Sequence, residues 1–142
     1  LWMMDDQGMS AEEITQVLYR ESGLKGLSGM TNDMRTLLAS EAPEAAEAVE
    51  YFVTRVAQEV ASMAAALGGI DALVFTGGIG EHSAHIRREV CKGMEWLGIA
   101  IDETKNAENA LDLATGATRV MVVKTDEERV IARAVNAALI RA

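Results

Sequence analysis

The residues best suited to contact a ligand form a glycine-rich segment, residues 76–81, with the sequence Thr-Gly-Gly-Ile-Gly-Glu. Glycine lacks a Cβ atom, so a ligand can approach the backbone closely where several glycines lie together. A helix that begins in this segment would direct unpaired backbone N–H groups at an anion. A tight turn without a ligand needs fewer glycines, so the pattern favours a nucleotide-binding loop.

Two known nucleotide-binding patterns can be compared with this segment. The P-loop pattern, which ends in Gly-Lys followed by Ser or Thr, is absent from the sequence. The dinucleotide pattern is closer, because Gly78 and Gly80 match its first two glycines, although Ser83 stands where glycine or alanine belongs. Asp102 imitates the acidic residue that binds a ribose in such folds. A dinucleotide-binding module therefore stays open as an alternative.

Two further groups of polar residues are candidates for ligand contacts. Arg35 has the chemistry to stack on a base or to bind a phosphate, although pairing with Asp33 at a helix start is the simpler interpretation. Residues 126–128 are all acidic and begin a predicted helix, where negative charge is favourable. A carboxylate at that position is also a candidate ligand for Mg²⁺.

His82 and His85 are three residues apart, but the neighbouring Arg87 and Arg88 disfavour a zinc site. Cys91 is the only cysteine, so no internal disulfide can form, and the sequence indicates a reducing, intracellular compartment. We expect Cys91 to be a small buried residue of a helix.

The elements that must position these residues follow from periodicity, caps and glycines. The predicted capping boxes begin at Ser10 and at Thr125, Thr31 or Asn32 is expected to cap a short helix, and Pro43 is expected to begin the longest helix. Helices are expected over 11–21, about 32–38, 43–67, 86–97, 102–116 and from 126 onward, strands over 72–76, 99–101 and 118–123, and a loop over 22–29. Alternating strands and helices indicate an α/β fold with a parallel sheet.

Composition limits the class of protein. The 142 residues carry a formal net charge of −9, and no strongly basic face is available to bind nucleic acid. The longest central apolar stretch, residues 60–70, is far shorter than the ~20 residues needed to cross a bilayer. We therefore expect one soluble globular domain without a nucleic-acid or membrane partner.

Four motifs together resemble the C-terminal part of the acetate and propionate kinase family. They are Ser-Gly-Leu-Lys-Gly-Leu-Ser-Gly at 22–29, Asp-Met-Arg at 33–35, Phe-Thr-Gly-Gly-Ile-Gly-Glu at 75–81, and Thr-Asp-Glu-Glu at 125–128. The resemblance implies part of a ribonuclease-H-like domain of the actin-like ATPase superfamily. Its short, mainly parallel sheet would be flanked by long helices, and residues 1–142 would form a C-terminal nucleotide-binding domain.

The resemblance also implies an activity and a set of binding residues. The family transfers the γ-phosphoryl group of ATP to acetate, giving acetyl phosphate and ADP, with Mg²⁺, and the compartment implied is the cytoplasm. Glu127 matches the acidic partner of Mg²⁺, and the predicted nucleotide contacts are Asp33, Met34, Arg35, Gly78, Ile79, Gly80, Glu81 and His82. His82, Lys124 and Asp126 depart from the family's usual Asn, Pro and Asn.

No catalytic residue of the family is expected in these 142 residues. The family's catalytic arginine and aspartate, its acetate pocket and its His-Leu-Gly-Asn-Gly loop precede the region shown, and the choice between acetate and propionate depends on that pocket. The chain does not begin with Met, and we expect a fragment that is inactive by itself.

One apolar seam of the 43–67 helix predicts an interface. Its members follow one another at helical spacing and are Val49, Phe52, Val56, Val60, Met63 and Leu67. Family resemblance and this seam together favour a homodimer, although neighbouring helices of the same chain would bury the seam equally well. A non-enzymatic interaction domain built on this helix is a further alternative.

Overall fold

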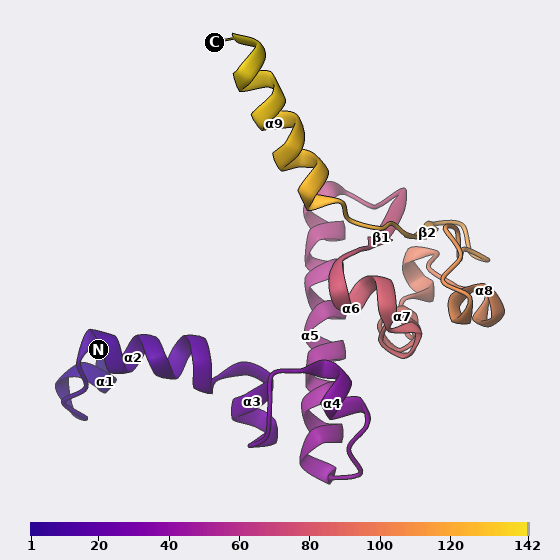
Figure 1. Cartoon of the computed structure of the whole chain (residues 1–142). Coiled ribbons are helices and arrows are strands. Elements are labelled where there is room, and N and C mark those ends of the chain that lie inside the picture. Colours follow the sequence, from indigo (N-terminus) through magenta and orange to yellow (C-terminus); the bar gives the residue numbers. More distant parts are fainter. Residues whose placement is uncertain (142) are drawn as a thin grey trace. The chain divides into compact units, whose positions relative to one another are not determined.

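The computed structural model describes residues 1–141, apart from the side chains of Glu127, Ile140 and Arg141. The chain forms two compact units, Leu1–Val60 and Ala61–Ala142. Figure 1 shows their elements in chain order. The first unit contains α1 (Trp2–Asp5), α2 (Ala11–Gln16), the π-helical turn η1 (Val17–Glu21), α3 (Gly23–Ser28), α4 (Met34–Leu38) and the first part of α5 (Pro43–Leu67). The second contains the end of α5, β1 (Ala72–Phe75), α6 (Gly77–His82), α7 (Ala84–Cys91), the 3₁₀ turn η2 (Glu95–Leu97), α8 (Glu103–Ala107), β2 (Arg119–Val122) and α9 (Glu127–Arg141).

The predicted capping box at the start of α2 is confirmed. The Ser10 hydroxyl accepts from the backbone N–H of Glu13 at 3.2 Å, and the Glu13 carboxylate accepts from the Ser10 backbone N–H at 2.8 Å. Both contacts satisfy backbone groups that a helix start otherwise leaves unpaired. The helix continues to Glu21 as predicted, with its last turn widened into η1.

The prediction of a loop over 22–29 is wrong, because α3 forms there. Two of the three glycines lie at its ends, and Gly29, at φ 65°, closes the helix by donating its N–H to the Lys25 carbonyl at 2.8 Å. The interior glycine, Gly26, approaches the preceding turn so closely that a Cβ atom there would lie 2.9 Å from the Glu21 carbonyl oxygen. These glycines therefore end and pack a helix, where composition alone suggested a loop.

The cap of α4 is Asp33, and the prediction of Thr31 or Asn32 in that role is wrong. The Asp33 carboxylate accepts from the Arg35 backbone N–H at 2.9 Å. Thr31 supports the cap by accepting from the Asp33 N–H, and Asn32 accepts from the Lys25 N–H. The predicted helix end at Leu38 is confirmed.

The longest helix runs over Pro43–Leu67 as predicted, and Gly68 and Gly69 follow it with positive φ. The buried side of its first part is formed by small residues, Ala45 and Ala48, with Val49 beside them. The far end of the predicted seam is exposed, because Leu67 is 75% accessible. The seam is therefore buried at one end only.

The second unit contains a parallel two-stranded sheet, as predicted. The sheet consists of β1 and β2 (Figure 1). Ala72 pairs with Arg119 at one end and Phe75 with Val122 at the other. β1 buries one face only, since Phe75 is buried whereas Val74 is 48% exposed.

The elements between the two strands are shorter than predicted. The helix expected to reach residue 97 ends at Cys91, because Gly93 takes a φ of 82°. The strand expected over 99–101 is reduced to one isolated bridge from Ile101 to Ala114. Asp102 caps α8 as predicted, but that helix ends at Ala107 and not near residue 116. The core of this unit includes buried apolar side chains of α7, of β2 and of the segments between them, among them Ile86, Val90, Ile99, Leu113 and Val120.

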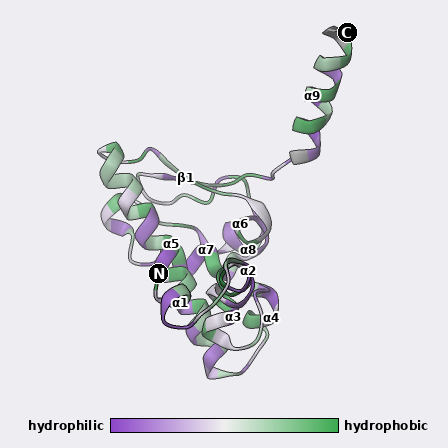
Figure 2. Ribbon diagram, turned by 90° about the vertical axis from the view of Figure 1, so that its left-hand side faces the viewer, coloured by the Kyte–Doolittle hydropathy of each residue, from purple (hydrophilic) through white to green (hydrophobic). Residues whose placement is uncertain are grey.

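The terminal helix α9 carries both apolar and polar residues (Figure 2), and its described apolar side chains, such as Val130 and Ile131, are exposed. Within the described part of the chain, none of the helices combines the length and the apolar character that crossing a membrane requires. The α/β class with a short parallel sheet is confirmed.

Candidate functional site

The two loops that carry the predicted ligand contacts of the second unit follow neighbouring strands. β1 leads into the glycine-rich α6, and β2 leads into the loop that precedes α9. Because β1 and β2 are parallel, both loops leave the same edge of the sheet. The crevice outside the carboxyl ends of parallel strands is the usual place for ligands in α/β folds.

One carboxylate oxygen holds these two loops together. Glu81 Oε1 accepts from the Gly77 backbone N–H at 2.9 Å, from the Thr125 backbone N–H at 2.8 Å and from the Thr125 hydroxyl at 2.7 Å. The Thr125 contacts, backbone first, lower the pKa of Glu81 below its ordinary value, with a smaller contribution from Gly77. Glu81 is buried, so its side chain is directed into the protein at this edge.

The glycines of α6 have different surroundings. Gly77 takes a φ of 71°, which favours glycine. A Cβ atom at Gly78 would meet nothing within 4 Å, whereas one at Gly80 would lie 3.3 Å from the Phe75 carbonyl carbon. Gly78 thus leaves backbone open to a ligand, while Gly80 allows α6 to pack on β1. The prediction that the backbone at both glycines contacts a ligand stays a prediction, and at Gly80 the absence of a side chain also serves packing.

The remaining predicted contacts of α6 are Ile79, which is half-buried, and His82, which is exposed. His85 interacts with Arg88 through its Nδ1 atom at 2.9 Å. Nowhere in residues 1–141, as far as their side chains are described, do three or more His, Cys, Asp or Glu residues gather as a metal site would require.

The predicted contacts Asp33, Met34 and Arg35 lie in the first unit. The Arg35 guanidinium donates to both carboxylate oxygens of Asp33, at 3.1 and 2.8 Å, and this interaction lowers the pKa of Asp33 to about 2. The Arg35 side chain is 91% exposed, whereas Met34 is buried. A ligand at α4 could therefore contact the Arg35 guanidinium, but only the backbone of Met34.

The predicted metal ligand, the Glu127 side chain, lies outside the described residues. Next to it, Asp126 accepts from the Arg129 backbone N–H at 2.9 Å and so caps α9. The prediction of a capping box that begins at Thr125 is wrong, because Asp126 is the cap and the Thr125 hydroxyl donates to the Glu81 carboxylate.

Sequence reasoning missed a buried cluster around Arg87. This side chain is 0% exposed and donates to the carbonyl oxygens of Gly80, Glu81 and Asn106 at 2.7–3.0 Å, and to the side chains of Asn106 and Asn109 at 2.8 and 2.6 Å. Desolvation lowers the pKa of Arg87. The cluster holds the end of α6 in place with neutral oxygen atoms. In the sequence, the indication that Arg87 is buried was its position beside the apolar residues Ile86 and Val90.

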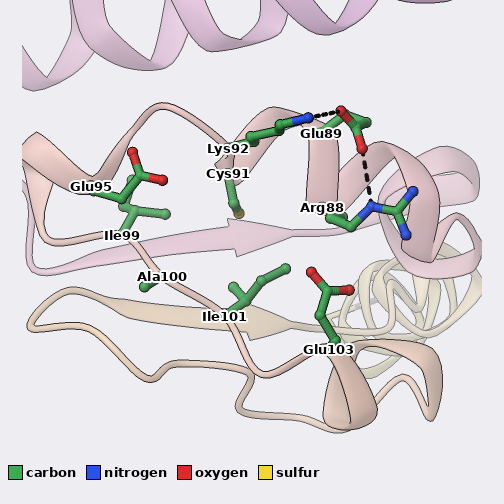
Figure 3. A pocket seen from close by; sticks show the side chains of 9 residues that line it. All are labelled: Arg88, Glu89, Cys91, Lys92, Glu95, Ile99, Ala100, Ile101 and Glu103. Atoms are coloured by element: carbon green, nitrogen blue, oxygen red, sulfur yellow. Dashed lines mark hydrogen bonds and ion pairs between the residues drawn. The ribbon is translucent and has the colours of Figure 1, made fainter.

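A separate pocket of about 340 Å³ lies beside the end of α7 (Figure 3). Its charged lining is already paired in part, because Glu89 interacts with Arg88 at 3.0 Å and with Lys92 at 3.5 Å. Cys91 also lines the pocket, and burial raises the pKa of its thiol to about 12. A thiol with so high a pKa is a poor nucleophile.

Comparisons with known proteins agree over nearly the whole chain. The model of the Acetokinase family matches residues 1–133. The acetate kinase of Methylocella silvestris is 53% identical to this chain over 135 residues. The acetate kinase of Rhodopseudomonas palustris is 50% identical to it over 137 residues. Each alignment covers 94% of this chain but only 33% and 34% of the relative, so the chain spans about a third of their length.

Solved structures show the same relationship. The acetate kinase of Porphyromonas gingivalis has a TM-score of 0.86 at 33% identity and covers 97% of this chain, with 37% of its own length aligned. The propionate kinase of Francisella tularensis has a TM-score of 0.80 at 40% identity, over 89% of this chain and 34% of its own length.

Proposed function

The chain belongs to the acetokinase family, and we propose that it forms the nucleotide-binding part of a kinase that transfers the γ-phosphoryl group of ATP to acetate or propionate. The products are the acyl phosphate and ADP, and we place the enzyme in the cytoplasm. The observation that carries this proposal is the family match over residues 1–133, which includes both loops at the edge of the sheet. We further assign the chain to a ribonuclease-H-like domain of the actin-like type.

Two groups of residues, one within each unit, are proposed to take part in nucleotide binding. In α6, the open position of Gly78 allows close approach to the backbone, and the exposed His82 is accessible at the end of the same helix. In α4, the Arg35 guanidinium is accessible, and its two hydrogen bonds to Asp33 fix its orientation. A planar guanidinium in a fixed orientation is suited to stacking on a base. Glu81 contributes through its backbone, since its carboxylate is engaged.

Mg²⁺ is proposed to be held by Glu127 together with the phosphates of the nucleotide. Mg²⁺ commonly binds through one or two carboxylates plus phosphate oxygens and water, so a carboxylate at the first residue of α9 fits that chemistry. When bound, the ion neutralises charge on the phosphates. The chain's own contribution is to fix the segment just before α9 through Thr125 and Glu81.

The residues described supply no set of cations for the transferred phosphoryl group. Phosphoryl transfer relies on positive groups that converge on the transition state. The Arg87 guanidinium is buried and bound to neutral oxygen atoms, and Arg35 is paired with Asp33. We therefore propose that catalysis requires protein segments beyond this chain and that the chain alone is inactive.

The alternative of a dinucleotide-binding module loses support from the local geometry. Ser83, at the third position of that pattern, ends α6 and caps α7 by accepting from the Ile86 N–H at 3.3 Å. Asp102 caps α8 by accepting from the Lys105 N–H. Neither position has the continuous helix or the preceding strand that the dinucleotide fold needs.

Calorimetric titration of the gene product at its full natural length with ATP, ADP and NAD tests the proposal. We expect ATP and ADP to bind and NAD not to bind, and we expect ATP-dependent formation of an acyl phosphate from acetate or propionate. A preference for NAD, or no nucleotide binding, would refute the proposal.

We also propose that the gene product is a homodimer in which α5 takes part. The exposed Met63 and Leu67, at the end of the apolar seam, favour such an interface. Leaving apolar side chains in water is unfavourable by about 25 cal/mol for each Å².

A further inference from the structure

The contact between Glu81 and Thr125 joins two segments that lie 44 residues apart in the sequence. A single carboxylate oxygen accepts from Gly77, at the start of α6, and from both donors of Thr125, just before α9. Charged acceptors form stronger hydrogen bonds than neutral ones. The first residue of the loop after β2 is tied to β1, because the Val123 N–H donates to the Phe75 carbonyl at 2.9 Å. The Glu81 contact therefore fixes the later part of the loop, at Thr125, relative to the glycine-rich helix.

The opposite end of α6 is held independently. Arg87 donates to the carbonyl oxygens of Gly80 and Glu81 at 2.8 and 3.0 Å, and these are backbone atoms that the Glu81 carboxylate does not contact. Because α6 is fixed at its end by Arg87, loss of the Thr125 contact would release the part of the loop next to α9 and leave the helix in place.

On the basis of the proposed function, we propose that Glu81 is a positioning residue that aligns the start of α9, which bears the Mg²⁺ carboxylate, with the segment that binds the nucleotide. Its carboxylate acts through Thr125, which lies two residues before Glu127. The Glu81 side chain thus has a role other than contact with the nucleotide.

Thr125→Val should change the Mg²⁺ dependence of ATP binding selectively. This change removes the hydroxyl donor and keeps the size of the side chain and the backbone donor. Nucleotide binding without Mg²⁺ depends on α6 and is expected to change less than twofold. The Mg²⁺ concentration that half-maximally enhances ATP binding is expected to rise roughly tenfold, as is usual when a group that orients a metal ligand is lost.

Four proteins at full natural length make the test specific. Thr125→Ser restores the hydroxyl and should return the Mg²⁺ requirement close to that of the unaltered protein. Glu81→Gln keeps the shape but removes the charge, and should raise the Mg²⁺ requirement. Thr104→Val makes the same exchange at an exposed position of α8, where the described hydrogen bonds do not involve the hydroxyl, and controls for the substitution itself. ATP binding is measured by calorimetry with and without Mg²⁺, and thermal unfolding is recorded for each protein.

A changed melting temperature with an unaltered Mg²⁺ requirement in Thr125→Val would show a merely structural contact and overturn the inference. An equal effect of Thr104→Val would do the same. If Thr125→Val fails to fold, Thr125→Ser and Glu81→Gln decide the matter, and normal Mg²⁺ dependence in Glu81→Gln refutes the positioning role. Absence of ATP binding in the unaltered protein is a different result, because it refutes the proposed function.

Discussion

Gly78→Ala and Gly80→Ala make the same chemical change two residues apart in α6, yet the structure predicts opposite effects on stability. A methyl group at position 78 would meet nothing within 4 Å. At position 80 it would lie 3.3 Å from the carbonyl carbon of Phe75 and 3.5 Å from the Cα and Cβ atoms of that residue. The neighbour at position 80 is β-strand backbone, which is paired with β2 and has little freedom to move.

The magnitudes follow from two opposing terms. Replacing a helical glycine with alanine stabilises the folded state by roughly 0.5–1 kcal/mol, because the unfolded chain loses conformational freedom. Position 78 gains this term without a steric cost. Overpacking typically costs about 1–3 kcal/mol, so Gly80→Ala should be destabilised by up to about 2 kcal/mol after the helical gain is subtracted.

Denaturant unfolding and ATP titration of both variants at full natural length separate the two roles. We expect Gly78→Ala to keep or increase its free energy of unfolding while binding ATP more weakly, because the methyl group occupies the open face. Equal stability of Gly80→Ala and the unaltered protein would refute the packing argument. Unchanged ATP affinity in Gly78→Ala would show that the nucleotide does not lie against this backbone.

Four further predictions concern stability, reactivity and assembly. Asn109, at φ 52°, accepts from Arg87, so Asn109→Gly should lose about 1–3 kcal/mol in denaturant unfolding, and Asn109→Ala should lose more because alanine disfavours that backbone conformation. Cys91 should resist thiol reagents in the folded protein and react on unfolding, and rapid labelling under native conditions would contradict its burial. The lowered pKa of Glu81 stabilises the folded state above its ordinary pKa of 4.5, and this contribution is lost as the pH falls through the folded value, so Thr125→Val should shift acid unfolding to higher pH in a circular dichroism titration. Light scattering should show a dimer that Val56→Glu weakens, and a monomer, or a dimer indifferent to the substitution, would remove α5 from the interface.

Local features of the structure could be predicted from the sequence because their causes lie within a few residues. The capping box joins Ser10 to Glu13, Pro43 begins α5, and Gly68 ends it. The apolar runs that form β1 and β2 are equally local, and the order of strand, helix and strand was sufficient to predict parallel pairing. The motifs of the acetokinase family could also be identified in the sequence, since they depend on residue identity alone.

Other features could not be predicted from the sequence where the role of a residue depends on how one element packs against another. Composition predicted a loop at 22–29, but the close approach of Gly26 to the preceding turn makes its glycine a requirement of packing. Gly80 was predicted to serve a ligand, and only the proximity of β1 shows that it also allows α6 to pack on that strand.

The same reason explains why the roles of Glu81 and Arg87 depended on the tertiary structure. Thr125 is 44 residues from Glu81, and Asn106 is 19 residues from Arg87. A carboxylate after a glycine-rich segment and an arginine within a helix have many permissible partners in a sequence. Burial decides among them, because a charged group removed from water must find hydrogen-bond partners where the fold brings them. The sequence by itself determined the family and the local elements, and the tertiary structure decided which side chains hold the nucleotide loop in place.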